Sequence, residues 1–207
     1  MPIAANARAS GKFYHHGAKM IRNLLVVSLA IIMVLGVAPA QGKECKGVSF
    51  PDQLQVDGRA LALNGLGLRQ ATMLKVNVYV AALYVTKTSA DANLLLGSSS
   101  PKQLVLQFLR NVSAAELNKA WDEGFDKRLA PFKDYLETLK GWMADMKTGQ
   151  RLTFVHRPGM GLEVDVNGAA KGTIKGDDFA KAFFSIWLGA NTPNPGLKSG
   201  LLGGACG

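Results

Sequence analysis

Arg69 and Tyr79 are two residues of the segment 64–85 whose types could hold an acid. A guanidinium can bind a carboxylate through two hydrogen bonds, and a phenol can add one more donor. From residue 74 to 80 apolar and polar side chains alternate, which predicts a strand with Tyr79 on its wetter face. That face is either exposed to solvent or forms the floor of a cleft. The residues expected on the packed face are Leu74, Val76, Val78 and Val80.

Common catalytic signatures are absent from the sequence. The patterns G-x-S-x-G, H-E-x-x-H and the phosphate-binding P-loop do not occur. His156 is the one histidine outside the first forty residues, and a lone histidine at a strand end is typical of a structural or exposed residue. Asp177 or Asp178 is expected to cap a helix rather than to bind a metal. The sequence therefore predicts no metal site and no cofactor.

Residues 20–40 have the organisation of a secretory signal peptide. Arg22 supplies positive charge, an apolar run follows it, and Ala38-Pro39-Ala40 matches the A-x-A cleavage pattern. The run is short for a membrane span of about 20 residues, and an uncleaved anchor is the alternative. We predict that residues 1–40 are a leader cleaved after Ala40, which leaves no stable membrane anchor. Met1 and Met20 are the alternative start codons.

Removal of the leader lowers the net charge of the chain. It takes away four of the 24 Lys and Arg residues and none of the 15 Asp and Glu residues, so the charge falls from +9 to +5. The remaining basic residues are scattered, which argues against nucleic acid as a partner. Residues 41–207 have the length of one ordinary domain.

Cys45 and Cys206 lie at opposite ends of the predicted mature chain. Neither belongs to a C-x-x-C pair, which disfavours a metal or thioredoxin-like site. In an exported protein, two lone cysteines favour a disulfide that ties the ends together. Two free thiols are the alternative.

The order of local signals predicts strands, then helices, then strands and a last helix. Asp57-Gly58 and Asn167-Gly168 are typical of tight hairpins. Ser113 and Glu116 form a capping box that begins a helix, and Gly189 is expected to end the last long helix. This order is typical of an α+β fold, with a large antiparallel sheet and helices on one face.

An apolar stripe at helical spacing follows the capping box. We expect a break near Ala130-Pro131, because proline disfavours helical structure in the residue before it. A stripe of this kind is usually part of a core, and the alternative is that some of it lines an apolar ligand pocket. Its members are Leu117, Trp121, Phe125, Leu129, Phe132, Leu136, Leu139 and Met143.

Several segments carry a family resemblance through their order along the chain. They are GVSFP, LNGLGLRQ, VNVYVAALYV, residues 108–113, the Asn-Gly hairpin and DFAKAFFSIWLG followed by PGLK. Together they resemble the chalcone isomerase-like superfamily, and above all its exported bacterial domains. The resemblance covers nearly all of residues 41–207. It implies an open-faced β-sandwich with a cleft between sheet and helices, in a protein of the periplasm of a Gram-negative-type envelope.

The resemblance also implies roles for particular residues. Arg69 matches the arginine that is catalytic in the enzymes and binds the head group in the binders, and Tyr79 takes the place of its partner on the next strand. Along the sequence, Tyr79 follows Arg69 by two fewer positions than its counterpart follows the arginine in the enzymes. Because this difference is an even number, the two residues can still pair across neighbouring strands. Tyr135 is similar to the family's helical tyrosine, and the helix-borne threonine-methionine pair falls on Ile186-Trp187. Without this role, Arg69 is a surface arginine and Tyr79 a half-exposed strand residue.

Members of the superfamily include plant enzymes that cyclise chalcones, fatty-acid binders and proteins without known activity. We therefore expect a non-catalytic protein that binds a small hydrophobic or amphipathic acid, such as a fatty acid. The first alternative is a chalcone isomerase-type intramolecular lyase. The second is a structural or partner-binding envelope module whose core is closed and whose protein partner is unknown.

Overall fold

The computed structural model describes residues 42–71, 74–125, 129–190, 192 and 194–206. The predicted signal peptide and its cleavage site lie outside the described residues. No helix in these ranges has the length and apolarity needed to cross a membrane.

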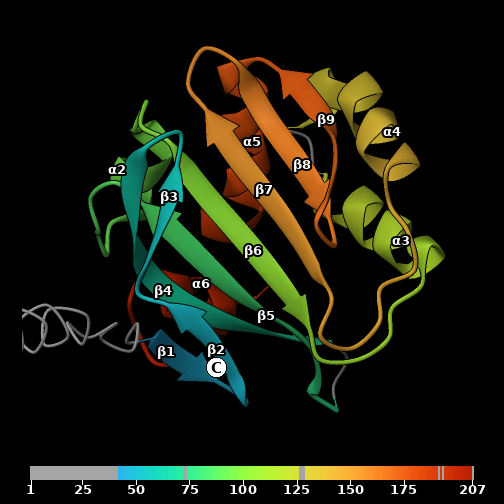
Figure 1. Ribbon diagram of the computed structural model, residues 1–207. Coiled ribbons are helices and arrows are strands. Elements are labelled where there is room, and N and C mark those ends of the chain that lie inside the picture. Colours follow the sequence, from blue (N-terminus) through green and yellow to red (C-terminus); the bar gives the residue numbers. More distant parts are fainter. Residues whose placement is uncertain (1–41, 72–73, 126–128, 191, 193, 207) are drawn as a thin grey trace, which may run out of the picture. The chain divides into compact units, whose positions relative to one another are not determined.

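An antiparallel sheet of seven strands forms the framework, and its strands neighbour one another in chain order (Figure 1). They are β3 (Gln53–Val56), β4 (Arg59–Ala71), β5 (Val76–Val85), β6 (Lys102–Phe108), β7 (Arg151–Arg157), β8 (Gly161–Val166) and β9 (Ala169–Lys175). A separate hairpin consists of β1 (Gly42–Cys45) and β2 (Val48–Pro51). The helices are α2 (Ala92–Gly97), α3 (Ala114–Gly124), α4 (Lys133–Gly141), α5 (Asp177–Leu188) and α6 (Pro195–Leu201), with a 3₁₀ turn, η2 (Ala130–Phe132).

Local sequence signals account for several of these boundaries. Asp57-Gly58 and Asn167-Gly168 connect β3 to β4 and β8 to β9, and all four residues have positive φ. A two-residue hairpin with a type I′ turn needs that conformation at both central positions. The capping box of Ser113 and Glu116 begins α3, and Gly189 follows the last residue of α5. These predicted boundaries are confirmed.

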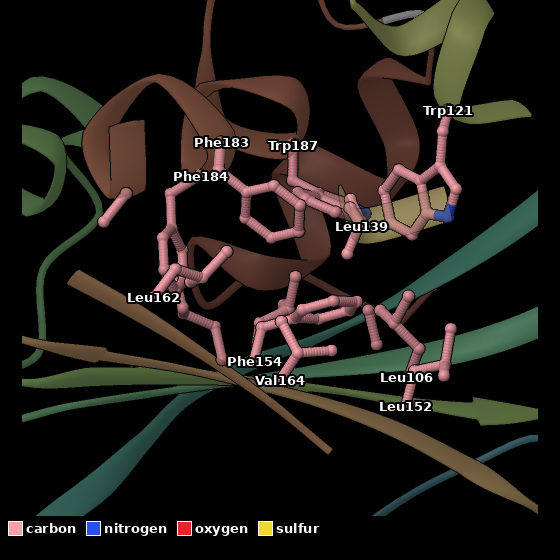
Figure 2. Close-up of a cluster of buried hydrophobic side chains, with 14 of the residues drawn as sticks. Leu106, Trp121, Leu139, Leu152, Phe154, Leu162, Val164, Phe183, Phe184 and Trp187 are labelled. Atoms are coloured by element: carbon pink, nitrogen blue, oxygen red, sulfur yellow. The ribbon is translucent and has the colours of Figure 1, made fainter. Parts of the chain in front are cut away.

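The main core lies between the sheet and the helices, as expected for an open-faced β-sandwich. Strands β6, β7 and β8 contribute apolar residues that pack against side chains from α3, α4 and α5 (Figure 2). The predicted helical stripe contributes to this core, and η2 separates α3 from α4 at the predicted break near Ala130-Pro131. The residues labelled in Figure 2 are Leu106, Trp121, Leu139, Leu152, Phe154, Leu162, Val164, Phe183, Phe184 and Trp187.

A second, smaller core covers part of the opposite face of the sheet. The β1–β2 hairpin places Phe50 against β4 and β5, beside the buried Tyr84. The Tyr84 hydroxyl donates to the carbonyl oxygen of Pro51 at 3.0 Å. The sequence analysis did not predict this cover.

The predicted disulfide joins Cys45 of β1 to Cys206, which follows α6. It closes a loop of 161 residues and holds the C-terminal segment beside the sheet. Helix α6 itself crosses β4 at close range. A Cβ atom added at Gly65 would lie 2.1 Å from the carbonyl oxygen of Gly200, so this approach of two backbones requires glycine.

Two local predictions are wrong. Leu74 and Val76 are largely exposed rather than packed, and Val78 joins the helix-side core whereas Val80 joins the opposite one. The register of β4 against β5 shifts after Arg69, and such an irregularity inserts a residue and breaks strict alternation. Neither aspartate caps α5: Gly176 precedes the helix, with no side-chain cap.

Candidate ligand-binding site

Arg69 and Tyr79 are direct partners across the β4–β5 ladder. The register shift comes immediately after this pair, between Arg69 and Gln70 on β4. Tyr79 packs against the core between sheet and helices, on the same face of β5 as Ala81 and Leu83. The structure therefore brings the two predicted residues together at one place on the helix-covered face.

Tyr79 is held from two sides. The Trp187 indole N–H donates to its phenolic oxygen at 3.1 Å, and the Phe108 ring lies edge-on with a centroid distance of 5.9 Å. Burial raises the pKa of Tyr79, although the Trp187 hydrogen bond and the nearby Arg69 charge act in the opposite direction. The phenol therefore stays protonated at neutral pH. Because Trp187 is the donor in this hydrogen bond, the Tyr79 hydroxyl is free to donate a hydrogen bond to a ligand.

Arg69 is half-buried, and one of its terminal nitrogens, Nη1, donates to the carbonyl oxygen of Gln70. The same carbonyl accepts from the Asn194 side chain at 3.3 Å, so the end of β4 is tied to the start of α6. Within the described ranges no carboxylate lies at salt-bridge distance from Arg69. Its remaining N–H groups are suited to a carboxylate supplied by a ligand.

A cavity of about 420 Å³ lies beside this pair, between the sheet and the helices. Its wall is largely apolar on both sides, as in most small-molecule sites. Arg110 and Glu116 form an ion pair of 3.1 Å on the same wall, and their opposite charges offset one another. The apolar lining residues are Ala71, Val78, Leu106, Phe108, Val112, Leu117, Ala120, Trp121, Leu152, Ile186, Trp187 and Leu197.

Of the other residues predicted for this site, Trp187 lines the cavity and Tyr135 does not. Tyr135 lies on α4, is 37% exposed, and stacks on Phe132 with ring centroids 6.0 Å apart. The next residue along the helix, Leu136, is the one that turns into the core. The predicted correspondence with the family's helical tyrosine thus places Tyr135 outside the cavity.

The helix α5 supplies only apolar atoms and an indole to the described wall. Ile186 and Trp187 occupy the place of the family's threonine-methionine pair, and both line the cavity. The neighbouring Ser185 donates its hydroxyl to the carbonyl oxygen of Ala182 at 2.6 Å, within its own helix. No hydroxyl of this helix therefore faces the cavity.

Some wall residues were not singled out by sequence reasoning. The sequence pattern placed Phe108 in a strand and Leu197 in the terminal turn or helix, without linking either to a site. The packing of Phe108 on Tyr79 is a tertiary contact between strands, which no local pattern indicates. Trp121 was expected in the core, with a pocket as the alternative. It does both, since it is buried among aromatic rings and also lines the cavity.

A polar cluster lies apart from this cavity wall, at the other end of α5, with Lys102 and His156 buried and Asp177 half-exposed. The Lys102 ammonium donates to His156 Nδ1 at 3.4 Å, and His156 Nε2 donates to the Asp177 carboxylate at 3.0 Å. Asp177 also accepts from the backbone N–H of Gly159. Burial lowers the pKa of His156, and it lowers that of Lys102 to about 8. His156 is thus a buried, hydrogen-bonded residue and not an exposed one, the two environments expected for it.

Fold and cavity together define an open-faced β-sandwich with an apolar cleft between sheet and helices. The family model described as chalcone isomerase-like matches residues 42–203, and the chain belongs to this family. Among solved structures it is similar to the crystal structure of a fatty-acid binding protein of Arabidopsis thaliana. The TM-score is 0.65 at 16% identity, over 78% of this chain and 96% of that one. A search of curated proteins gave no match.

The cavity contradicts the closed core that was expected for the second alternative, the structural or partner-binding module. A structural module with a closed core predicts no ligand-sized space between sheet and helices, whereas the described residues enclose about 420 Å³ there. The space also carries a polar pair in its wall, Arg69 and Tyr79. A mostly apolar space with a few polar groups in its wall is typical of small-molecule sites.

Proposed function

We propose that this protein is an exported, non-catalytic carrier that binds a small amphipathic acid, such as a fatty acid, in the cavity between sheet and helices. The observation that carries the proposal is the cross-strand pair of Arg69 and Tyr79 in the wall of an otherwise largely apolar cavity. The guanidinium takes the carboxylate, and the phenol adds a hydrogen bond to it. The apolar wall takes the hydrocarbon chain.

Arg69 and Tyr79 are preorganised to bind an anion. Tyr79 accepts from Trp187 and retains its own proton, so its hydroxyl is a donor polarised by the indole. Arg69 has no carboxylate partner in the described part of the chain, so a ligand carboxylate displaces no ion pair among those residues. The similarity to a fatty-acid binding protein supports the same ligand class, although it rests on the fold.

Binding is favoured over isomerisation by the composition of the α5 wall. Cyclisation of a chalcone needs donors and an ordered water where enolate-like charge develops. In this chain the helix presents Ile186 and Trp187 to the cavity, and the Ser185 hydroxyl is bonded inside its helix. The pair of Arg69 and Tyr79 supplies the charge and the hydroxyl donor that suit a carboxylate head group.

We propose the periplasm as the location, on the basis of the signal peptide pattern that ends at Ala40. The test is the intact mass of the protein recovered from a periplasmic extract. A mass that begins at Gln41 supports export and cleavage. A mass that includes the apolar run of residues 24–35 contradicts cleavage.

The binding proposal is tested by calorimetric titration of the mature chain with decanoate and with decanol. Arg69→Ala should weaken decanoate binding by about 2–3 kcal/mol, as expected for a hydrogen bond to a charged group. The same variant should bind decanol as the unmodified protein does, since the alcohol carries no charge. Arg59→Ala is the matched control, because Arg59 is exposed at the far end of β4.

Three results would overturn parts of this proposal. Equal decanoate affinity of Arg69→Ala and the unmodified protein removes Arg69 as the anchor. Absence of binding by both probes removes the carrier function and favours a protein partner. Flavanone formation from a chalcone above background, lost in Arg69→Ala, contradicts the non-catalytic assignment.

A further inference from the structure

The end of the β4–β5 hairpin presents apolar side chains to solvent. Leu74 is 86% exposed and Val76 is 43% exposed. Gln70 braces this end of the hairpin, because its side-chain amide donates to the carbonyl oxygen of Lys75 at 3.2 Å and to Asn77 Oδ1 at 2.9 Å. The two apolar side chains are therefore held outward by a hydrogen-bonded turn.

This end of the hairpin extends past the neighbouring strands. The ladder of β5 with β6 begins at Tyr79, and next to it the Leu109 N–H donates to the carbonyl oxygen of Val78. On the other side, the ladder of β3 on β4 covers residues 59–62. The part of the hairpin with Leu74 and Val76 therefore projects beyond the described strands of the sheet, where the fold itself does not bury these side chains.

The projecting end is continuous with the wall of the ligand cavity. Val76 pairs across the ladder with Ala71, which lines the cavity, and Val78 on the same strand lines it as well. Arg69, the proposed acid anchor, lies two residues before Ala71 on β4, which is about 7 Å of extended strand. A partner that binds the projecting end therefore lies close to the part of the cavity that holds the acid group.

The charge of this region is positive. Lys75 is exposed between Leu74 and Val76, and the sequence from residue 58 to 90 contains no aspartate or glutamate. Besides Arg69, the described cavity wall has two bases and two acids, whose charges offset one another: Arg110, Lys119, Glu116 and Glu123. Lys75 and Arg69 therefore leave an excess of positive charge beside the exposed apolar pair.

We propose that Leu74, Lys75 and Val76 form a docking surface for an anionic lipid bilayer. A bilayer takes up protruding apolar side chains without a shaped recess, and its anionic head groups attract an adjacent lysine. Two apolar residues and one cation give a weak, reversible contact rather than an anchor. Docking brings the Arg69 end of the cavity to the membrane, where amphipathic acids partition. The exchange of ligand with the bilayer rests on the proposed carrier function.

The experiment is co-sedimentation of the ligand-free mature chain with lipid vesicles. The unmodified protein should bind vesicles of phosphatidylglycerol and phosphatidylcholine in equal parts, and bind phosphatidylcholine vesicles more weakly. Leu74→Ser combined with Val76→Thr should lower the partition coefficient about tenfold, because less apolar surface enters the acyl region. Lys75→Glu should lower it about tenfold on the anionic vesicles and have little effect on the neutral ones.

Two exposed positions elsewhere provide matched controls. Leu94→Ser removes an apolar side chain that is 66% exposed on α2, and Lys171→Glu reverses an exposed charge on β9. Neither residue belongs to the described wall of the cavity. Both variants should bind the anionic vesicles nearly as well as the unmodified protein does. Because every substituted side chain is exposed, all variants should keep the urea midpoint of the unmodified protein.

Calorimetry with decanoate distinguishes failure of docking from failure of the carrier function. If decanoate binds but the vesicles do not, or if Leu74→Ser with Val76→Thr binds vesicles normally, docking is overturned and the carrier function stands. If the vesicles bind as expected but no acid does, the carrier function is overturned and the docking surface stands. A dimer in sedimentation velocity that dissociates in the same double variant would assign this surface to a second copy of the chain and overturn lipid docking.

Discussion

Trp187 donates its indole N–H to the phenolic oxygen of Tyr79 across 3.1 Å, although 108 residues separate the two in the chain. The bond joins the end of α5 to β5 beside the cavity. It also fixes the direction of the Tyr79 hydroxyl, because the oxygen accepts on one side and can donate on the other. The helical layer thereby orients the Tyr79 hydroxyl, which we propose binds the head group of the ligand.

This relationship predicts that Tyr79 and Trp187 act as one unit in ligand binding. Tyr79→Phe should weaken decanoate binding by about 0.5–1.5 kcal/mol, the usual net value of a hydrogen bond. Trp187→Phe should weaken decanoate binding by less than Tyr79→Phe does. The double variant should weaken it by less than the sum of the two single effects, because Trp187 acts through Tyr79. The measurement is a double-mutant cycle of calorimetric affinities.

Tyr84→Phe provides the control for this cycle. Its hydroxyl is bonded to the Pro51 carbonyl in the core on the other face of the sheet, so its loss should lower stability and leave affinity unchanged. Strict additivity of Tyr79→Phe and Trp187→Phe would contradict the proposed unit.

The close approach of α6 to β4 predicts that Gly65→Ala is destabilising. The added Cβ would lie 2.1 Å from the Gly200 carbonyl oxygen, so the helix has to move, at a cost of about 1–3 kcal/mol. Leu197 of α6 lines the cavity, so decanoate affinity should fall as well. Urea unfolding and calorimetry measure the two effects.

Gly141→Ala is the matched substitution for Gly65→Ala. It lies at the end of α4 with open space around the added methyl group, and its unfolding free energy should be unchanged or slightly higher. Equal stability of the two variants would show that α6 accommodates the methyl group without moving.

The disulfide of Cys45 and Cys206 should contribute strongly to stability. It closes a loop of 161 residues, and removal of a native disulfide typically costs about 2–5 kcal/mol. The double substitution Cys45→Ser with Cys206→Ser should lower the urea midpoint by a corresponding amount, and reduction of the unmodified protein should reproduce the shift. An unchanged midpoint in both experiments would mean that α6 holds its place through packing alone.

The polar cluster of Lys102, His156 and Asp177, whose two basic members are buried, predicts a pH dependence of stability. Burial lowers the pKa of Lys102 from 10.5 to about 8, so the unfolded chain binds more protons than the folded one between these values. Stability from this group therefore rises as the pH increases from about 8 to 10.5. Since the pKa of His156 is also lowered, stability falls as the pH drops below its ordinary 6.5.

Lys102→Met isolates the alkaline part of this dependence. The unfolding free energy of the unmodified protein, minus that of the variant, should increase between pH 8 and pH 10.5 in urea titrations. Lys171→Met removes an exposed lysine of β9 and is the matched control for the change of charge. A difference for Lys102→Met that does not change with pH would mean that its ammonium is solvated in the folded protein.

Local signals and strand periodicity were enough to predict much of this fold. Positive φ at Asp57-Gly58 and Asn167-Gly168 follows from residue type, and the capping box of Ser113 is a contact over three residues. The partnership of Arg69 with Tyr79 followed from the resemblance and from the even change in spacing.

Features that depend on distant contacts could not be predicted. The irregularity after Arg69 has no sequence signal, and it exposes Val76. The rotation of α4, which turns Tyr135 outward, is set by which side chains fill the core. Asp177 was expected to cap its own helix, but it is instead bonded to His156 on a strand 21 residues earlier.

The measurement that tests the central claim most directly is native mass spectrometry of the mature protein purified from its own cells. We predict a bound species in the mass range of a fatty acid, lost in Arg69→Ala and retained in Arg59→Ala. A ligand-free mass for the unmodified protein, both as purified and after incubation with decanoate, would contradict the claim that Arg69 and Tyr79 form an acid-binding site.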